Sequence, residues 1–181
     1  MLEWIGLLIV LVVVAGWLYI SYYNKIRILE NRIDEAWAQI DVQLKKRFDL
    51  VPNLVETVKG YASHEKDIFD NIAKARAGLV SGNPGERMQA DNMLSGALRQ
   101  LFAVAEAYPD LKAGENFKLL QEQLEGIENK IAYARQYYNS SVLQFNNMIT
   151  TIPGSWFAGG RGKREFFEVP EEAREVPKVK F

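Results

Sequence analysis

The sequence predicts an all-α protein, with an N-terminal transmembrane helix that continues into an elongated antiparallel four-helix bundle. Three observations predict this fold. Apolar residues recur in steps of three and four along four long segments, which is the period of a helix face. No segment alternates apolar and polar residues as a strand does, and one stretch near the N-terminus carries no charge. We divide the chain into an anchor at 1–24, a bundle at 25–152 and a loop-rich C-terminal tail at 153–181.

The anchor is the uncharged stretch from Trp4 to Asn24. Its residues, at about 1.5 Å each, span about 31 Å, which matches the hydrocarbon core of a bilayer. Aromatic residues at both ends suit the two interfacial belts. A cleaved signal peptide is the alternative, but the chain starts without a basic residue and offers a poor cleavage site. We therefore expect residues 4–24 to cross the lipid bilayer.

The basic residues near the span predict its orientation. None precedes it, whereas Lys25, Arg27 and Arg32 follow it closely. The positive-inside rule then places the short N-terminus outside and the C-terminal domain in the cytoplasm. The chain is expected to cross the membrane once.

The composition excludes several classes of function. Net charge is −1, and Glu3 is the only charged side chain before Lys25, so the remainder carries 22 charges of each sign. A neutral domain is a poor match for nucleic acid, which needs a basic face. The chain has no Cys, which excludes disulfides, thiol nucleophiles and thiolate metal sites.

Four helices are expected in the bundle, at about 25–62, 64–79, 86–107 and 115–150. Pro52 removes a backbone donor within the first of them, so we expect a kink there rather than a break. Gly and Pro mark the turn at 81–85, and Tyr108-Pro109-Asp110 stops the third helix. The first and last helices are the longest, so the chain should return close to the bilayer near Pro153. The apolar positions of the first helix are Ile26, Leu29, Ile33, Trp37, Ile40, Leu44, Phe48, Val51, Val55 and Val58.

Several long blocks of sequence resemble the bacterial LemA family in order. They are the block 32–65, the blocks Ala105 to Lys112 and Glu115 to Phe117, and the block Glu128 to Asn139. The resemblance extends to the N-terminal anchor and to Phe166-Phe167-Glu168 in the tail. It implies a single-pass protein of the bacterial plasma membrane with a cytoplasmic helical bundle. It does not imply a catalytic activity, because the family has no established biochemical role.

A metal centre is the first candidate site to be weighed. Helical bundles hold di-iron through Glu residues and paired Glu-x-x-His motifs. The single histidine, His64, has no Glu three residues before it, so two such motifs cannot form. We predict no metal and no cofactor.

Six polar residues on the two long helices are a candidate buried polar network. Each set of three is spaced to fall on one helix face, the first around Pro52. Because buried polar groups usually pair, we interpret them as satisfying one another and the carbonyl freed by the proline, with a ligand site as the alternative. The six are Asp49, Asn53, Glu56, Glu128, Arg135 and Asn139.

Two further stretches could be structural or functional. The stretch from Tyr108 to Lys112, with Asn116, is interpreted as the end of one helix and the start of the next, with Asp110 as a cap. The alternative is a loop on which a partner docks. Lys45-Lys46-Arg47 reads as a solvated face, because it lies too far from the bilayer for attraction.

The tail is a candidate second membrane contact. Aromatic and basic side chains occur together there, and basic residues near an anionic leaflet contribute about 1 kcal/mol each. A mobile tail, or one that covers the lower end of the bundle, explains the composition equally well. The candidate residues are Trp156, Phe157, Arg161, Lys163 and Arg164.

These features favour a membrane-anchored scaffold or interaction protein without catalytic activity. An accessory subunit of a membrane enzyme, such as a protease or an export complex, is the alternative. An enzyme using paired carboxylates is the weakest hypothesis, since no standard nucleophilic or nucleotide motif is present. The expected partners are the bilayer, an unidentified membrane protein and, because the long stripe resembles a coiled-coil seam, a second copy of the chain.

Overall fold

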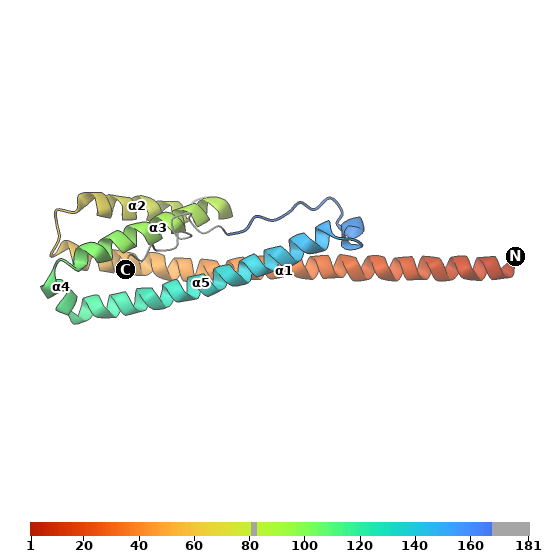
Figure 1. The fold of residues 1–181 in the computed structure, drawn as a ribbon, viewed down its shortest axis with the longest axis horizontal. Helices are drawn as coiled ribbons and strands as arrows, with labels where there is room; N and C mark the ends of the chain where they lie inside the picture. Colours follow the sequence, from red (N-terminus) through yellow and green to blue (C-terminus); the bar gives the residue numbers. More distant parts are fainter. Residues whose placement is uncertain (81–82, 168–181) are drawn as a thin grey trace, which may run out of the picture. The chain divides into compact units, whose positions relative to one another are not determined.

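The computed structural model describes residues 1–80 and 83–167, and its longest element is the single helix α1, Leu2–Lys59 (Figure 1). The predicted span and the predicted first bundle helix are thus one uninterrupted helix. It continues through Pro52. Buried residues on either side of the proline, Val51 and Leu54, pack the helix where one backbone hydrogen bond is missing.

The remaining described elements are also helical, and no strand occurs in the described ranges, which confirms the all-α prediction. Three of them begin and end within two residues of their predicted limits. These are α2, Lys66–Val80, α3, Pro84–Ala105, and α5, Glu115–Thr150. A short helix α4, Pro109–Ala113, and a 3₁₀ turn η1, Gly154–Phe157, complete the set.

Helix α3 begins inside the predicted turn at 81–85, because Pro84 and Gly85 already belong to its first turn. The Asn83 side chain accepts a hydrogen bond from the Glu86 backbone N–H at 3.0 Å, and the Glu86 carboxylate accepts one from the Asn83 N–H at 3.2 Å. Pro84 follows the cap, at the position where its missing donor costs nothing. This capping box satisfies two donors that a helix start leaves free. Residues 81 and 82 of the predicted turn lie outside the described residues.

The stretch after Tyr108 differs from its predicted role. Residues 109–113 form α4 instead of a simple stop, and Asp110 lies in its first turn while the cap position belongs to Tyr108. Pro109 is pre-organised for a first helical position. Leu111 is buried and fixes this short helix in unit 2, defined next.

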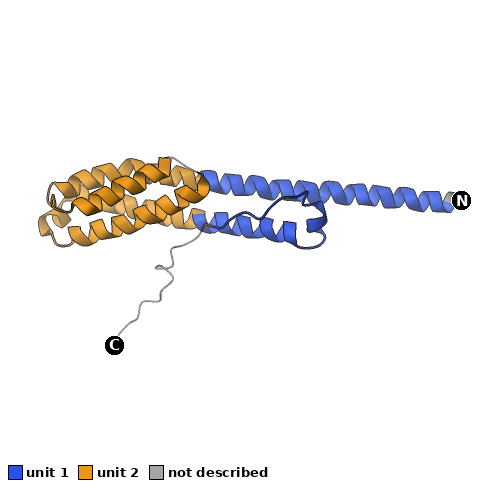
Figure 2. Cartoon of the chain, turned by 90° about the horizontal axis from the view of Figure 1, so that it is seen from above, with its two compact units in different colours: residues 1–38, 135–166 blue, residues 39–134, 167–181 orange. Residues whose placement is uncertain are grey.

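The chain divides into two compact units, and both α1 and α5 contribute to each (Figure 2). Unit 1 consists of residues 1–38 and 135–166. Unit 2 consists of residues 39–134, with Phe167 as its last described residue.

Unit 2 is a four-helix arrangement in which successive long helices alternate in direction. Along α1, Asp41 bonds Arg87 of α3 and Arg47 bonds Asp91 of α3, so α1 and α3 run parallel. Contacts of α1 with α2, and of α3 with α5, run in opposite directions. Helices α2 and α3 pack closely at Gly78, where an added Cβ would lie 2.8 Å from the Ala90 Cβ. The most completely buried aliphatic residues of unit 2 include Ile40, Leu44, Leu54, Ile72, Leu94, Leu101, Leu111 and Leu124.

Unit 1 pairs the first part of α1 with the last part of α5. The Trp37 and Tyr138 rings meet edge to face at 5.7 Å, and Arg32 Nη1 donates to Gln144 Oε1 at 3.0 Å. As numbers fall along α1 they rise along α5, so the two segments are antiparallel. The buried apolar residues here are Ile26, Ile33, Ala36, Tyr138, Val142, Phe145 and Ile149.

The tail is partly built into unit 1. After η1, the backbone of Arg164 exchanges two hydrogen bonds with the Asn146 amide, at 2.8 and 2.9 Å, and the Tyr138 hydroxyl donates to the Glu165 carbonyl at 3.2 Å. Phe166 is exposed, whereas Phe167 is buried. The rest of the predicted tail, 168–181 with Glu168, lies outside the described residues.

The predicted anchor has the surface that a bilayer requires. Every side chain from Glu3 to Ile20 is exposed, and nearly all are large and apolar. Among the described residues, α1 is the one helix long and apolar enough to cross a membrane. Such a continuous apolar surface is far larger than a water-soluble helix tolerates.

Candidate functional site

Arg47 carries one of the two fully buried charges found in the described part of unit 2, and Asp91 carries the other. Arg47 stands three residues after Leu44 and four before Val51, both of which are core positions of α1. The predicted apolar face of the first helix has Phe48 between Leu44 and Val51, where the structure buries Arg47. In the structure, Phe48 is half-buried beside the core and the Arg76 guanidinium lies 4.2 Å from its ring centroid.

Arg47 connects three helices. Its Nη1 donates to Asp91 Oδ1 of α3 at 2.6 Å, and its Nη2 donates to Ser95 Oγ at 2.9 Å. Glu128 of α5 forms an ion pair with the same Nη2. We call Arg47, Asp91, Ser95 and Glu128 the unit 2 arginine cluster.

Burial gives this cluster its energetic character. Arg47 and Asp91 are fully buried, whereas the Glu128 side chain is 38% exposed. A buried ion pair gains little over an apolar one, but removing one partner leaves an uncompensated charge and is strongly destabilising. The cluster therefore fixes which faces of α1, α3 and α5 meet.

The interpretation of the basic triplet as a solvated face is wrong for one of its three residues. Lys45 and Lys46 are exposed, and Lys45 pairs with Asp49 one turn later, at 3.0 Å. Arg47 is inside. The signal that identifies it is its spacing from Leu44 and Val51, which sequence reasoning passed over because the residue is charged.

The predicted buried polar network does not form around Pro52. Asp49, Asn53 and Glu56 are exposed in unit 2, because this face of α1 points away from the residues that bury Val51, Leu54 and Val58. One predicted member, Glu128, does take part in a polar cluster, and its partner is Arg47.

The other two predicted members, Arg135 and Asn139, belong to unit 1 and are half-buried there. Both have interaction partners in the structure.

A groove of about 490 Å³ opens beside this cluster, between α3 and α5. Its floor is apolar and its rim is charged, which is the usual make-up of a binding groove. The residues that line it are Ser95, Leu98, Arg99, Phe102, Gln121, Leu124, Glu125 and Glu128.

A second arginine cluster lies in unit 1, where Arg161 of the tail meets residues of α1. Arg161 Nε donates to Glu30 Oε1 at 2.8 Å, and its guanidinium lies 5.4 Å from the ring centroid of Tyr23. Arg27 donates to the other Glu30 oxygen at 2.9 Å. We call Arg161, Glu30, Arg27 and Tyr23 the unit 1 arginine cluster.

The electrostatics of Glu30 follow from this arrangement. Partial burial alone would raise the pKa of its carboxyl, but hydrogen bonds and charge from Arg161 and Arg27 outweigh burial and hold the pKa below its usual value. Elsewhere in unit 1, burial raises the pKa of the Tyr138 phenol. Glu30 is therefore ionised and bound from two sides at neutral pH.

The five predicted membrane-contact residues lie in different surroundings. Phe157 is half-buried and stacks on Tyr22, and Arg161 is engaged by Glu30. Trp156, Lys163 and Arg164 are exposed. Phe157 also contacts Tyr19, so the chain after α5 lies beside the end of the apolar stretch of α1.

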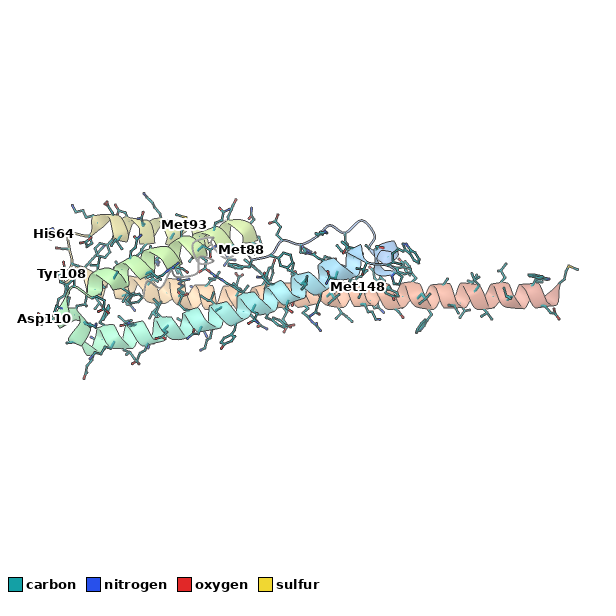
Figure 3. The ribbon with its side chains drawn as sticks, in the orientation of Figure 1. His64, Met88, Met93, Tyr108, Asp110 and Met148 are labelled. Atoms are coloured by element: carbon teal, nitrogen blue, oxygen red, sulfur yellow. The ribbon has the colours of Figure 1, made fainter. Side chains whose placement is uncertain are left out.

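The third predicted candidate lies at one end of unit 2, where His64, Tyr108 and Asp110 are found (Figure 3). Within residues 1–80 and 83–167, no three His, Asp or Glu side chains are grouped so that they could hold a metal ion. Lys112 pairs with Glu106 across this end, and both side chains are exposed. The geometry here is that of a surface loop with a short helix.

Comparison with known families gives a match over most of the chain. The model of the LemA family matches residues 36–181. The chain belongs to the LemA family. The match begins at Ala36, so it includes the whole of unit 2 and starts after the apolar stretch of α1.

Named relatives come from two settings. Two proteins of Paramagnetospirillum magneticum, magnetosome proteins MamQ 1 and MamQ 2, are each 25% identical over 175 residues, covering 81% of this LemA-family chain and 64% of their own. Protein LemA of Metamycoplasma hominis is 25% identical over 139 residues, covering 74% of this chain and 62% of its own. The chain thus spans less than two thirds of the length of these relatives.

Proposed function

We propose that this LemA-family protein is a membrane-anchored scaffold without catalytic activity of its own, which presents a helical bundle for binding other proteins. One observation carries the proposal: the apolar stretch and the core helix of the bundle are the same uninterrupted helix, α1. A domain that shares a helix with its anchor is joined to it without an intervening loop. Such a domain is suited to holding a partner in place.

The chemistry of the bundle interior supports a structural role. The buried charges of unit 2 are engaged with one another in the cluster around Arg47, where they hold three helices together. A catalytic acid or base needs access to a substrate, and Arg47 and Asp91 have none. The relatives also support a scaffold. One is named as a magnetosome protein and another only as protein LemA, so the names tie the shared sequence to no single process.

Chemical crosslinking in native membranes tests the scaffold. We expect adducts larger than the monomer, either with a second copy or with a membrane protein that mass spectrometry identifies. Recovery of monomer alone, at native abundance, would count against a scaffold.

The groove between α3 and α5 favours a second candidate function, an accessory subunit of a membrane enzyme. Arg99→Glu reverses a charge on its exposed rim and should reduce recovery of a partner that docks there. Lys74→Glu is the matched control, since it makes the same change on an exposed position of α2. Equal loss of the partner in both variants would point to general charge effects and exclude docking in the groove.

The proposed placement is a plasma membrane, with the N-terminus outside and the bundle in the cytoplasm. Lys25, Arg27 and Arg32 after the span support this orientation. The chain has no Cys, so Glu3→Cys and Ser63→Cys each introduce one unique thiol. A maleimide that cannot cross membranes should label position 3 on intact cells and position 63 only after lysis. The reverse pattern would invert the topology.

A further inference from the structure

The turn that follows α5 exposes two large apolar side chains. Ile152 is 72% exposed and Trp156 is 71% exposed, although the turn itself is built into unit 1. An exposed Trp on an ordered turn indicates a surface that meets something other than water.

The turn is fixed in place at its beginning. A Cβ on Gly154 would overlap the carbonyl oxygen of Met148, a residue near the end of α5 that is labelled in Figure 3. Only glycine allows η1 to lie this close to α5. Gly159 and Gly160, both with positive φ, then reverse the chain after the turn.

The turn is also fixed against α1, at the end of the apolar stretch. The Phe157 ring stacks on Tyr22 with centroids 5.2 Å apart and planes 14° apart, and it meets Tyr19 edge to face at 6.1 Å. Four residues later, Arg161 bonds Glu30 of α1. The turn is thus attached to α1 on both sides of Tyr23.

This attachment sets the depth of the turn in a bilayer. Tyr19 and Tyr22 belong to the aromatic group that ends the uncharged stretch, and Lys25 is the first charge after it. Tyr and Trp side chains at that position lie at the level of the lipid headgroups. A turn stacked on Tyr22 lies at the same level.

We propose that Ile152 and Trp156 form a second contact with the membrane interface, beside the anchor. The occupant of this surface is the glycerol and headgroup region of the lipid. Phe157 and Arg161 are positioning residues, since their side chains are engaged by Tyr22 and Glu30. Lys163 and Arg164 are exposed on the same segment and can meet anionic headgroups. The proposal rests on the membrane anchoring stated under the proposed function.

Lipid is a better occupant than a protein groove for two reasons. The surface continues directly from the exposed apolar stretch of α1, through Tyr19 and Tyr22. It also has the composition of an interfacial anchor, in which an amphipathic indole and an aliphatic side chain are followed by basic residues.

Depth-resolved fluorescence quenching tests the proposal on the full chain. Ile152→Cys and Val10→Cys each supply the single thiol for an environment-sensitive fluorophore, since the chain has no other. The labelled proteins are reconstituted into vesicles of phosphatidylcholine with a minority of phosphatidylglycerol. The lipids carry nitroxide quenchers either at the headgroup or deep in the acyl chain. We expect position 152 to be quenched mainly by the headgroup quencher and position 10 mainly by the deep one.

The outcomes separate this proposal from the anchoring on which it rests. Quenching at position 10 without quenching at position 152 would overturn the second contact and leave the anchor intact. Absence of quenching at both positions would overturn the anchor and, with it, the second contact.

A further substitution tests the second position of the contact. Trp156→Cys, labelled in the same way, reports on position 156 itself, and because Trp156 is exposed the fold should persist. We expect it to be quenched mainly by the headgroup quencher, as at position 152. A label at position 156 that neither quencher reaches would show that this side chain does not contact lipid.

Discussion

The two units each contain an arginine that binds carboxylates from another part of the chain, yet the two arginines have different surroundings. Arg47 of unit 2 lies in the core, with Asp91 equally buried. Arg161 of unit 1 lies at the surface, where its side chain is 18% exposed and that of Glu30 is 12% exposed. The same chemical pair is therefore found with and without access to water.

Access to water decides what each arginine can do. In the core, an unpaired charge costs several kcal/mol, so the unit 2 arginine cluster acts on the whole helical arrangement. At the surface, water solvates whatever a broken pair leaves behind, so the unit 1 arginine cluster can only hold a local segment. This contrast predicts global effects in unit 2 and local effects in unit 1, and hydrogen exchange measured region by region distinguishes them.

The largest effect is expected for Arg47→Met. It leaves the carboxylates of Asp91 and Glu128 without their shared cation, which should destabilise unit 2 by about 3–5 kcal/mol. Hydrogen exchange should accelerate across α2, α3 and the unit 2 part of α5. Lys45→Met, two residues earlier and exposed, should change stability by less than about 0.5 kcal/mol.

A combined replacement sharpens this prediction. Adding Asp91→Leu and Glu128→Gln to Arg47→Met also removes the two carboxylates that Arg47 binds and should recover most of the loss, as apolar groups often replace buried pairs well. If the triple variant stays as unstable as Arg47→Met, the loss comes from packing and not from charge.

The next largest effect is expected in unit 1, for Gly154→Ala. The added methyl would overlap the Met148 carbonyl, at a cost of about 1–3 kcal/mol. Faster exchange should be confined to the end of α5 and the turn. Gly162→Ala is the control, because a Cβ there meets nothing within 4 Å. Loss of protection in α3 would show that the turn supports more than its own unit.

A smaller effect is expected for Arg161→Gln. Removing the bond to Glu30 should cost about 1 kcal/mol, because this pair is only partly buried. Exchange should accelerate at 158–166 while unit 2 is unchanged. Arg161→Lys should restore part of the protection, since it keeps the charge but loses the planar fork. Lys163→Gln, exposed on the same segment, should have no effect.

The smallest effect is the response of the tail to acid. The folded-state pKa of Glu30 lies below its ordinary value of 4.5, so its contribution to stability is complete above pH 4.5 and is lost as the pH falls through the lower folded-state pKa. The protection factors of the amides at 158–166, which correct for the slower intrinsic exchange in acid, should therefore fall at acid pH. Glu30→Gln should make this segment insensitive to pH in that range. A response that persists in Glu30→Gln would assign it to another group.

Helix positions could be read from the sequence because their signals are local. The capping box of Asn83 and Glu86, and Pro84 after it, specify the start of α3 from adjacent residues. The apolar steps on α1 predicted the buried face through Ile26, Ile33, Ile40 and Leu44. These features need no partner helix to be recognised.

The polar sites could not be read in the same way. The spacing of Asp49, Asn53 and Glu56 around Pro52 predicts that they share a helix face, but spacing on one helix does not reveal which face a second helix covers. The charge of Arg47 predicts a place at the surface, because charged residues usually lie there. Its burial depends on Asp91 and Glu128, which are distant in the sequence and come close only when α3 and α5 pack on α1.

The sequence by itself determined the uncharged apolar stretch, the limits of α2, α3 and α5, and the family, because each is encoded by neighbouring residues. The tertiary structure alone decided that Arg47 is internal and that Phe157 and Arg161 attach the turn to α1. The physical reason is that burial and pairing depend on which side chains meet across helices, and residues far apart in the chain determine those meetings.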